Sequence, residues 1–302
     1  MSRVRILISC GVTRQDGSES GSLSTFMNKE KFRRLLFGEF SALRIIRSII
    51  FIYVVLCIYA YFFTDSILFQ PQPPSYQDTS EIIKLKTADG IQISATYLPN
   101  PQATYTILYS HGNAEDLGDV IPALQNIRDI GFAVFAYDYH GYGTSQGKPS
   151  ESTAYLDINA AYDYLTQQLK LPSKKIIVYG RSVGGGPAVD LASRKSVAGL
   201  ILESTFITAF RSVTQIPLVP FDRFRNIDKI AHIHCPVLLI HGRSDRTIPF
   251  SHGQELFRAA NEPKGFFWVD GAGHNDVMEV AGNRYGEMLR EFSQVVVSPN
   301  PH

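Results

Sequence analysis

Residues 175–193 read KIIVYGRSVGGGPAVDLAS and contain the most informative pattern in the chain. An apolar run of strand-forming residues leads directly into GRSVG (180–184), and a pattern of small and apolar residues typical of a helix follows. A strand that turns this tightly into a helix needs small residues two positions before and after the central serine, whose side chain projects from the turn. The pattern predicts a strand–turn–helix unit with Ser182 at its tip.

Short apolar runs alternate with helical patterns on both sides of this unit. The runs are TILYS (106–110), FAVFAYD (132–138), AGLILE (198–203), PVLLIHG (236–242) and FFWVD (266–270). Because these runs lack polar alternation, we expect strands buried on both faces of a parallel sheet that helices cover. Residues 80–99 instead alternate around Asp89-Gly90 and predict an antiparallel hairpin. The chain therefore predicts an α/β fold with a mostly parallel, doubly wound sheet of about eight strands.

Four helices are expected around this sheet in addition to the helix that follows Ser182. Apolar spacing predicts helices over 117–130 and 152–169, and a last helix over about 277–295. Ser251 and Gln254 form a possible capping box at the start of another helix.

A serine nucleophile needs a base and an orienting carboxylate, and both residue types follow later strands. Asp245 comes after the run PVLLIHG, and His274 comes after FFWVD. The carboxyl ends of parallel strands meet at one edge of the sheet, where ligands bind in such folds. The order serine, acid, histidine is that of hydrolases with this turn. The sequence therefore predicts Ser182, Asp245 and His274 as a catalytic triad.

The loop after TILYS reads His111-Gly112-Asn113-Ala114 and is the expected source of an oxyanion hole. We expect the backbone N–H of Asn113 to act with that of Val183, with Ala114 as the alternative to Asn113. Two further acids have structural interpretations. Asp138 is expected to brace the HGYG loop after it, and Asp276 to cap the last helix rather than tune His274.

The segment 204–227, STFITAFRSVTQIPLVPFDRFRNI, is rich in apolar side chains and is expected to cross above the turn at Ser182 as a short cap. Phe206, Ile207, Phe210 and Leu218 are its predicted contributions to a substrate pocket. The alternative is that these side chains only pack on the sheet. If they line an acyl pocket, each buried CH₂ of a substrate adds about 0.8 kcal/mol of binding.

The N-terminal part predicts a membrane anchor. Six cations precede the uncharged apolar run Ser48–Phe63, which Ile45 and Ile46 before it and Ile67–Phe69 after it lengthen; they are Lys29, Lys31, Arg33, Arg34, Arg44 and Arg47. The run is long enough to span a bilayer, which takes roughly 20 residues, and no small-residue cleavage site follows it. The expected organisation is a cytoplasmic, largely disordered basic tail (1–43), a transmembrane anchor (44–69), a Pro-rich linker (70–79), the catalytic domain (80–296) and a tail (297–302). The cations place the N-terminus in the cytoplasm and the domain on the non-cytoplasmic side.

Composition excludes several classes of function. The chain of 302 residues has a formal charge of +1, which offers no electrostatic basis for binding nucleic acid. Cys10, Cys57 and Cys235 show no spacing of a disulfide framework or metal site. His232 and His234 form an HxH pair without an evident third ligand. No metal or other cofactor is therefore expected, and His111, His140, His241 and His252 are interpreted as structural.

Five segments carry a resemblance to a known family. They are HGNAEDLG (111–118), YDYHGYGTSQGKPSE (137–151), YGRSVGGGPAVDLASR (179–194), PVLLIHGRSDRTIPFSHG (236–253) and GAGHND (271–276). Together they resemble the α/β-hydrolase-domain protein depalmitoylases and their membrane-anchored, prolyl-oligopeptidase-like relatives. The resemblance implies the α/β-hydrolase fold, Ser182 as nucleophile, Asp245 as acid and His274 as base, and hydrolysis of acyl esters or thioesters.

Two features depart from the depalmitoylases. Those proteins have a Cys-rich, lipidated N-terminus, whereas this chain has one cysteine in its tail followed by the apolar span. In addition, the residue before the serine is Arg181 here, whereas the depalmitoylases resemble GQS at this turn. The expected function is a membrane-anchored serine esterase or acyl thioesterase, acting on a lipid or a lipidated protein. A serine peptidase and a non-catalytic scaffold with the same fold are the alternatives.

Overall fold

The computed structural model describes residues 42–212, 214 and 216–297. The predicted basic tail therefore lies almost wholly outside the described residues, as does nearly all of the predicted C-terminal tail. Residues from Val55 onward form one compact unit, and residues up to Val54 belong to another.

An eight-stranded sheet forms the centre of the larger unit. Its strands are β1 (Ile83–Lys86), β2 (Gln92–Leu98), β3 (Thr106–Ser110), β4 (Ala133–Tyr137), β5 (Ile176–Arg181), β6 (Gly199–Glu203), β7 (Val237–Gly242) and β8 (Lys264–Val269). They lie in the order β1-β2-β4-β3-β5-β6-β7-β8. The hairpin β1–β2 and the β2–β4 pair are antiparallel, and the other pairs are parallel. The predicted hairpin and the mostly parallel sheet are confirmed.

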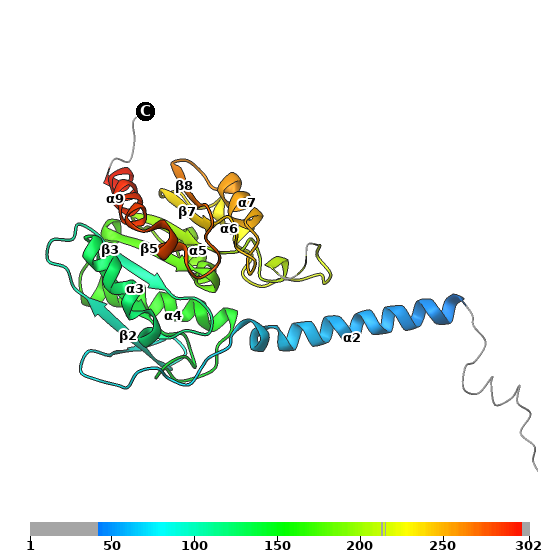
Figure 1. The fold of residues 1–302 in the computed structure, drawn as a ribbon. Coiled ribbons are helices and arrows are strands. Elements are labelled where there is room, and N and C mark those ends of the chain that lie inside the picture. Colours follow the sequence, from blue (N-terminus) through cyan, green and yellow to red (C-terminus); the bar gives the residue numbers. More distant parts are fainter. Residues whose placement is uncertain (1–41, 213, 215, 298–302) are drawn as a thin grey trace, which may run out of the picture. The chain divides into compact units, whose positions relative to one another are not determined.

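Helices cover both faces of this sheet (Figure 1). Every residue of β3, β4, β6 and β7 is buried, which explains their uninterrupted apolar sequences. On one face, α3 (Leu117–Ile130) and α9 (Asn283–Val297) pack with side chains such as Leu124 and Leu289. On the other, α4 (Glu151–Asp163), α5 (Gly185–Arg194), α6 (Asn226–Ile230) and α7 (Ser251–Ala259) contribute Ile158, Val189 and Leu256 to a second core cluster.

The strand order creates a switch point between β3 and β5. The chain leaves β3 for β4 on one side and then crosses to β5 on the other side of β3. Loops at the carboxyl ends of two such strands diverge to opposite faces, which leaves a crevice where ligands of this fold class bind. The loop at Gly112 and the turn at Ser182 meet there.

Three predicted helices end or begin differently in the structure. The helix expected over 152–169 is α4 followed by a π-helical turn, Tyr164–Gln168. The predicted capping box of Ser251 and Gln254 is wrong, because Phe250 is already helical and no side chain caps α7. Capping boxes form instead at Asp116 for α3 and Ser150 for α4.

The prediction of a single last helix over 277–295 is also wrong. The structure has α8 (Val277–Ala281) and α9, separated by Gly282 at φ 53° and ψ −134°. Residues that carry a side chain rarely adopt a positive φ, whereas glycine does so readily. The apolar periodicity continues through the break, so it did not indicate the interruption.

The predicted anchor coincides with α2 (Ala42–Leu68), a helix of 27 residues. Its length and composition are sufficient to cross a membrane, with a window of mean hydropathy 2.2. Its large apolar side chains from Leu43 to Phe63 are mostly exposed, as in Phe51 at 68% and Phe62 at 71%. Such an all-round apolar surface suits lipid rather than water. After α2, Phe69 is buried, and Ser75 N–H donates to Asp116 Oδ2 at 2.8 Å.

Candidate active site

The turn at Ser182 joins β5 to α5 through a 3₁₀ turn, Ser182–Gly184. Ser182 has φ 53°, a left-handed conformation that costs energy for a residue with a side chain. A Cβ at Gly184 would lie 2.2 Å from the carbonyl oxygen of Ser110, and one at Gly180 would lie 2.5 Å from the Gly184 oxygen. These approaches explain why small residues flank the serine at both positions, as the sequence pattern indicates.

The structure brings Ser182, His274 and Asp245 together. His274 Nε2 lies 3.0 Å from Ser182 Oγ, and His274 Nδ1 lies 2.8 Å from Asp245 Oδ2. Asp245 follows β7 and His274 follows β8, so each side chain reaches the site from its own strand end. A nucleophile hydrogen-bonded to a base, and a base hydrogen-bonded to a carboxylate, are the geometry of an activated serine.

Asp245 is held in its charged form by a set of donors. The backbone N–H groups of Thr247 and Ile248 donate to its Oδ1 at 2.9 and 2.8 Å. Burial opposes its ionisation, but hydrogen bonds from His241, His274 and Ile248 outweigh burial and hold the pKa of Asp245 well below its usual range. An ionised Asp245 fixes the orientation of the His274 ring and stabilises its positive charge when the ring takes a proton.

The loop that carries His274 is braced by Asp276. Its Oδ1 accepts a hydrogen bond from Gly273 N–H at 2.6 Å, and no side chain caps α8. The predicted capping role of Asp276 is therefore wrong. The Asp276 side chain bonds back to the loop at Gly273 instead of to the first backbone amides of α8.

The loop after β3 is fixed around the side chain of Asn113. Its Oδ1 accepts hydrogen bonds from Ala114 N–H at 2.9 Å, from Gln70 N–H at 2.9 Å and from the Tyr142 hydroxyl at 2.6 Å. Because Ala114 N–H is engaged in this way, the N–H groups of Asn113 and Val183 are the stronger candidates for an oxyanion hole. Asn113 and Val183 both line the cavity that contains Ser182.

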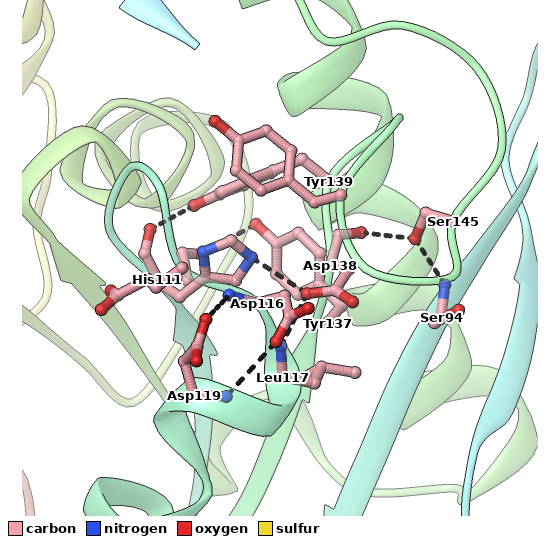
Figure 2. Close-up of polar contacts among 12 residues, drawn as sticks. Ser94, His111, Asp116, Leu117, Asp119, Tyr137, Asp138, Tyr139 and Ser145 are labelled. Atoms are coloured by element: carbon pink, nitrogen blue, oxygen red, sulfur yellow. Dashed lines mark hydrogen bonds and ion pairs between the residues drawn. The ribbon is translucent and has the colours of Figure 1, made fainter. Parts of the chain in front are cut away.

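Asp138 braces the start of α3 (Figure 2). The Oδ1 atom accepts from Leu117 N–H at 2.9 Å and lies 3.3 Å from His111 Nε2, and both side chains are fully buried. The Tyr76 hydroxyl donates to Oδ2 at 2.5 Å. Burial opposes protonation of His111, but the hydrogen bond to Asp138 and its charge raise the pKa of His111. Asp138 thus braces the loop after β3 and the start of α3. Its role is not confined to the HGYG loop that follows it.

A cavity of about 1490 Å³ opens above Ser182 and His274. Phe206 and Phe210, which belong to the cap segment, residues 204–227, line it. Within the described part of the chain, Ile207 and Leu218 are not among its lining residues: Ile207 is 5% exposed in the core, and Leu218 is 56% exposed at the surface.

Arg181 connects the loops around the site, a role that the sequence did not indicate. Its Nη1 donates to Glu115 Oε1 at 2.7 Å, its Nη2 donates to Asn275 Oδ1 at 2.8 Å, and its Nε lies 3.5 Å from Glu203 Oε1. Glu115 Oε1 also accepts from Gly112 N–H at 2.5 Å. One guanidinium therefore ties the loop after β3 to the loop that carries His274.

The second oxygen of the Glu203 carboxylate in this network also has hydrogen-bond donors. Glu203 Oε2 accepts from the hydroxyls of Tyr179 at 2.6 Å and Tyr285 at 2.8 Å. The only sequence signal was a cation inside a turn that otherwise contains small and apolar residues. Glu115 and Asn275, the hydrogen-bond partners of Arg181, lie 66 and 94 positions away in the chain, so sequence spacing did not identify them.

Comparisons with known proteins identify relatives of this chain. A model of the family described as serine aminopeptidase, S33, matches residues 101–221. Alpha/beta hydrolase domain-containing protein 17B of Homo sapiens is 42% identical over 227 residues, which cover 74% of this chain and 78% of the relative. Protein 17C of Xenopus tropicalis is 39% identical over 219 residues, or 71% and 70% of the two chains.

Solved structures show the same fold. An esterase of Pyrococcus furiosus superposes with a TM-score of 0.63 at 21% identity, covering 74% of this chain and 98% of the other. Est1E of Butyrivibrio proteoclasticus, solved with ferulic acid, gives a TM-score of 0.59 at 20% identity, covering 70% and 99%.

Arg181→Met should destabilise the fold, because it leaves the buried Glu203 and the half-buried Glu115 without their cation. Breaking such a pair costs about 3 kcal/mol, which lowers Tm by roughly 6–12 °C in a domain of this size. Arg243→Met removes an exposed pair, 3.0 Å from Asp270, and should change Tm by less than about 4 °C. Thermal unfolding of the full chain, followed by Trp268 fluorescence, compares the two. Equal shifts would show that the network does not hold the loops.

Proposed function

Because the chain belongs to the alpha/beta hydrolase family that includes the domain-containing 17 proteins, we propose that it is a serine hydrolase of carboxylic esters or acyl thioesters. One observation carries the proposal: His274 lies within hydrogen-bond distance of both Ser182 and Asp245, at 3.0 and 2.8 Å. This arrangement supports acyl transfer through a covalent intermediate.

The proposed reaction has two halves. Ser182 Oγ attacks the carbonyl carbon while His274 Nε2 takes its proton, and the N–H groups of Asn113 and Val183 bind the resulting oxyanion. His274 then returns the proton to the departing alcohol or thiol, which leaves an acyl ester on Ser182. Water, deprotonated by His274, hydrolyses that ester and regenerates the serine. Each oxyanion donor is worth roughly 3–4 kcal/mol in the transition state.

Ester or thioester cleavage is favoured over the aminopeptidase reaction that the family model's description names. An aminopeptidase binds the free amino group of its substrate, and an unpaired carboxylate near the nucleophile suits that task. Glu115 and Glu203, the two carboxylates that contact the turn, are already engaged by Arg181, although Glu279 also lines the cavity. The rings of Phe206 and Phe210 line the same cavity and suit an acyl chain.

Ser182→Ala and His274→Ala should each lower kcat by about 10⁴-fold or more, because triad members act as a unit. Asp245→Asn should be comparable or milder, since Asp245 orients the base rather than reacting. Hydrolysis of a butanoyl nitrophenyl ester and a butanoyl thioester by the full chain measures these effects. Ser193→Ala is a matched control, because Ser193 lies in α5 with its hydroxyl bonded to the Asp190 carbonyl. Hydrolysis by Ser182→Ala at the rate of the Ser193→Ala control would refute the assignment.

We also propose that α2 anchors the enzyme in a membrane with its N-terminus in the cytoplasm and the hydrolase domain on the other side. The support is the helix's length and apolar composition, together with the six cations that precede or enter it. Arg44 and Arg47 lie in the first turns of α2. The other four lie outside the described residues. This orientation would give the site non-cytoplasmic lipid or lipidated-protein substrates.

Protease treatment of sealed vesicles with their cytoplasmic face outward tests the orientation. The hydrolase domain should resist digestion until detergent opens the vesicles, whereas a tag at the N-terminus should be removed at once. A lumenal marker protein is the control for vesicle integrity. Digestion of the domain in intact vesicles would reverse the proposed orientation and make cytoplasmic lipidated proteins the favoured substrates.

A further inference from the structure

The last turns of α2 belong to the catalytic domain and do not serve only as a tether. Thr64 is 5% exposed, and Phe69, directly after the helix, is 3% exposed. The Phe69 ring lies 6.2 Å from that of Tyr139, and 5.9 Å from that of Phe224 in the cap segment. Since Val55 to Leu68 lies in the same compact unit as the sheet, this end of the helix has a defined place beside the site.

The cap segment contacts this end of α2 through Arg223. Its Nη2 donates to the carbonyl oxygen of Tyr61 at 3.2 Å, and its Nε lies 3.5 Å from Asp65 Oδ1. The guanidinium also lies 5.3 Å from the centre of the Tyr61 ring. Phe221 packs edge-on against that ring at 5.6 Å. The cap segment is therefore held against the helix end by charge and by aromatic packing.

The loop after β3 holds the same helix end on another side. Gln70 N–H, two residues past α2, donates to Asn113 Oδ1 at 2.9 Å and lies 3.0 Å from the Tyr142 hydroxyl. Asn113 is the residue proposed to supply an oxyanion donor. The end of the helix is thus bonded to the catalytic machinery itself.

Three residues of this helix end line the cavity above Ser182; they are Thr64, Ile67 and Leu68. Phe206 and Phe210 of the cap segment line the same cavity. Ile67 is 59% exposed although it belongs to the wall, so the cavity is open to the outside at this residue. Apolar surface continues from Ile67 along the same face of the helix to Phe63, which is half-exposed.

We propose that the end of α2 is a substrate-binding element: the acyl chain of a membrane-resident ester or thioester passes along Ile67 and Leu68 to reach Ser182. A chain that leaves the bilayer through water loses about 0.8 kcal/mol for each CH₂ exposed. An apolar wall that continues from the anchoring helix into the cavity removes most of that cost. The helix that holds the enzyme at the membrane therefore also selects long acyl chains, given the acyl hydrolysis proposed above.

Ile67→Trp tests this passage by narrowing it. The full chain is reconstituted in phosphatidylcholine vesicles, and kcat/KM is measured for hexadecanoyl and butanoyl nitrophenyl esters. We expect Ile67→Trp to lower the ratio of hexadecanoyl to butanoyl kcat/KM at least tenfold. Ile58→Trp is the matched control, because it makes the same change in the same helix at a similarly exposed residue, 52% against 59%, that does not line the cavity. Its ratio should stay within twofold of that of the unmodified chain.

The outcomes separate this inference from the proposed function. Equal ratios in Ile67→Trp and Ile58→Trp, with an active enzyme, would overturn the acyl passage and leave ester hydrolysis standing. An unmodified chain that hydrolyses none of the acyl substrates would overturn both. If Ile67→Trp lowers Tm by more than a few degrees, Ile67→Asn replaces it: a polar wall of similar size should lower the ratio in the same direction, and an unchanged ratio contradicts the passage.

Two membrane-resident substrates distinguish the source of the acyl chain. One is a monoacylglycerol and the other an S-hexadecanoyl peptide, each inserted in the same vesicles. The substrate with the higher kcat/KM identifies a lipid or a lipidated protein as the favoured source. In both cases Ile67→Trp should lower kcat/KM relative to Ile58→Trp, and an effect on neither substrate contradicts the proposal.

Discussion

The close approach of the backbone at Gly184 to the carbonyl oxygen of Ser110 is the constraint on which the site depends. A single Cβ at Gly184 would lie 2.2 Å from that oxygen. The contact brings the turn after β5 against the loop after β3, so that Ser182 and Val183 lie in one cavity with Asn113. Ser182 accepts a left-handed backbone conformation as part of the same arrangement. A strained serine of this kind persists because the packed sheet and α5 hold the turn on both sides.

Local patterns predicted the elements well, because each strand and helix has its own periodicity. The run at 106–110 and the helix at 117–130 match β3 and α3. The placement of Ser182, Asp245 and His274 after the ends of β5, β7 and β8 also followed from the sequence pattern, since parallel strands bring their carboxyl ends to one edge. Gly282 was not recognised as a break, because a glycine within an apolar repeat indicates neither its φ nor a helix end.

Contacts between distant residues were beyond sequence reasoning. Arg181 was noticed only as an unusual residue, yet its guanidinium joins Glu115 and Asn275, on two loops that no local pattern connects. The same holds for Gln70, whose bond to Asn113 attaches the end of α2 to the loop after β3. Both sets of contacts join segments that are distant in the sequence and that the fold brings together. They explain how one short turn, two loops and a helix end form a single wall around the serine.

A covalent label tests directly whether Ser182 is an activated nucleophile facing an acyl-binding cavity. The full chain in detergent is treated with a hexadecyl fluorophosphonate, which releases fluoride as the serine oxygen bonds to phosphorus, and the adduct is mapped by peptide mass spectrometry. We predict one adduct, on Ser182, and none after heat denaturation, because the His274 and Asp245 contacts activate the oxygen only in the folded chain. An adduct on another residue, or a folded chain that takes no label, would contradict it.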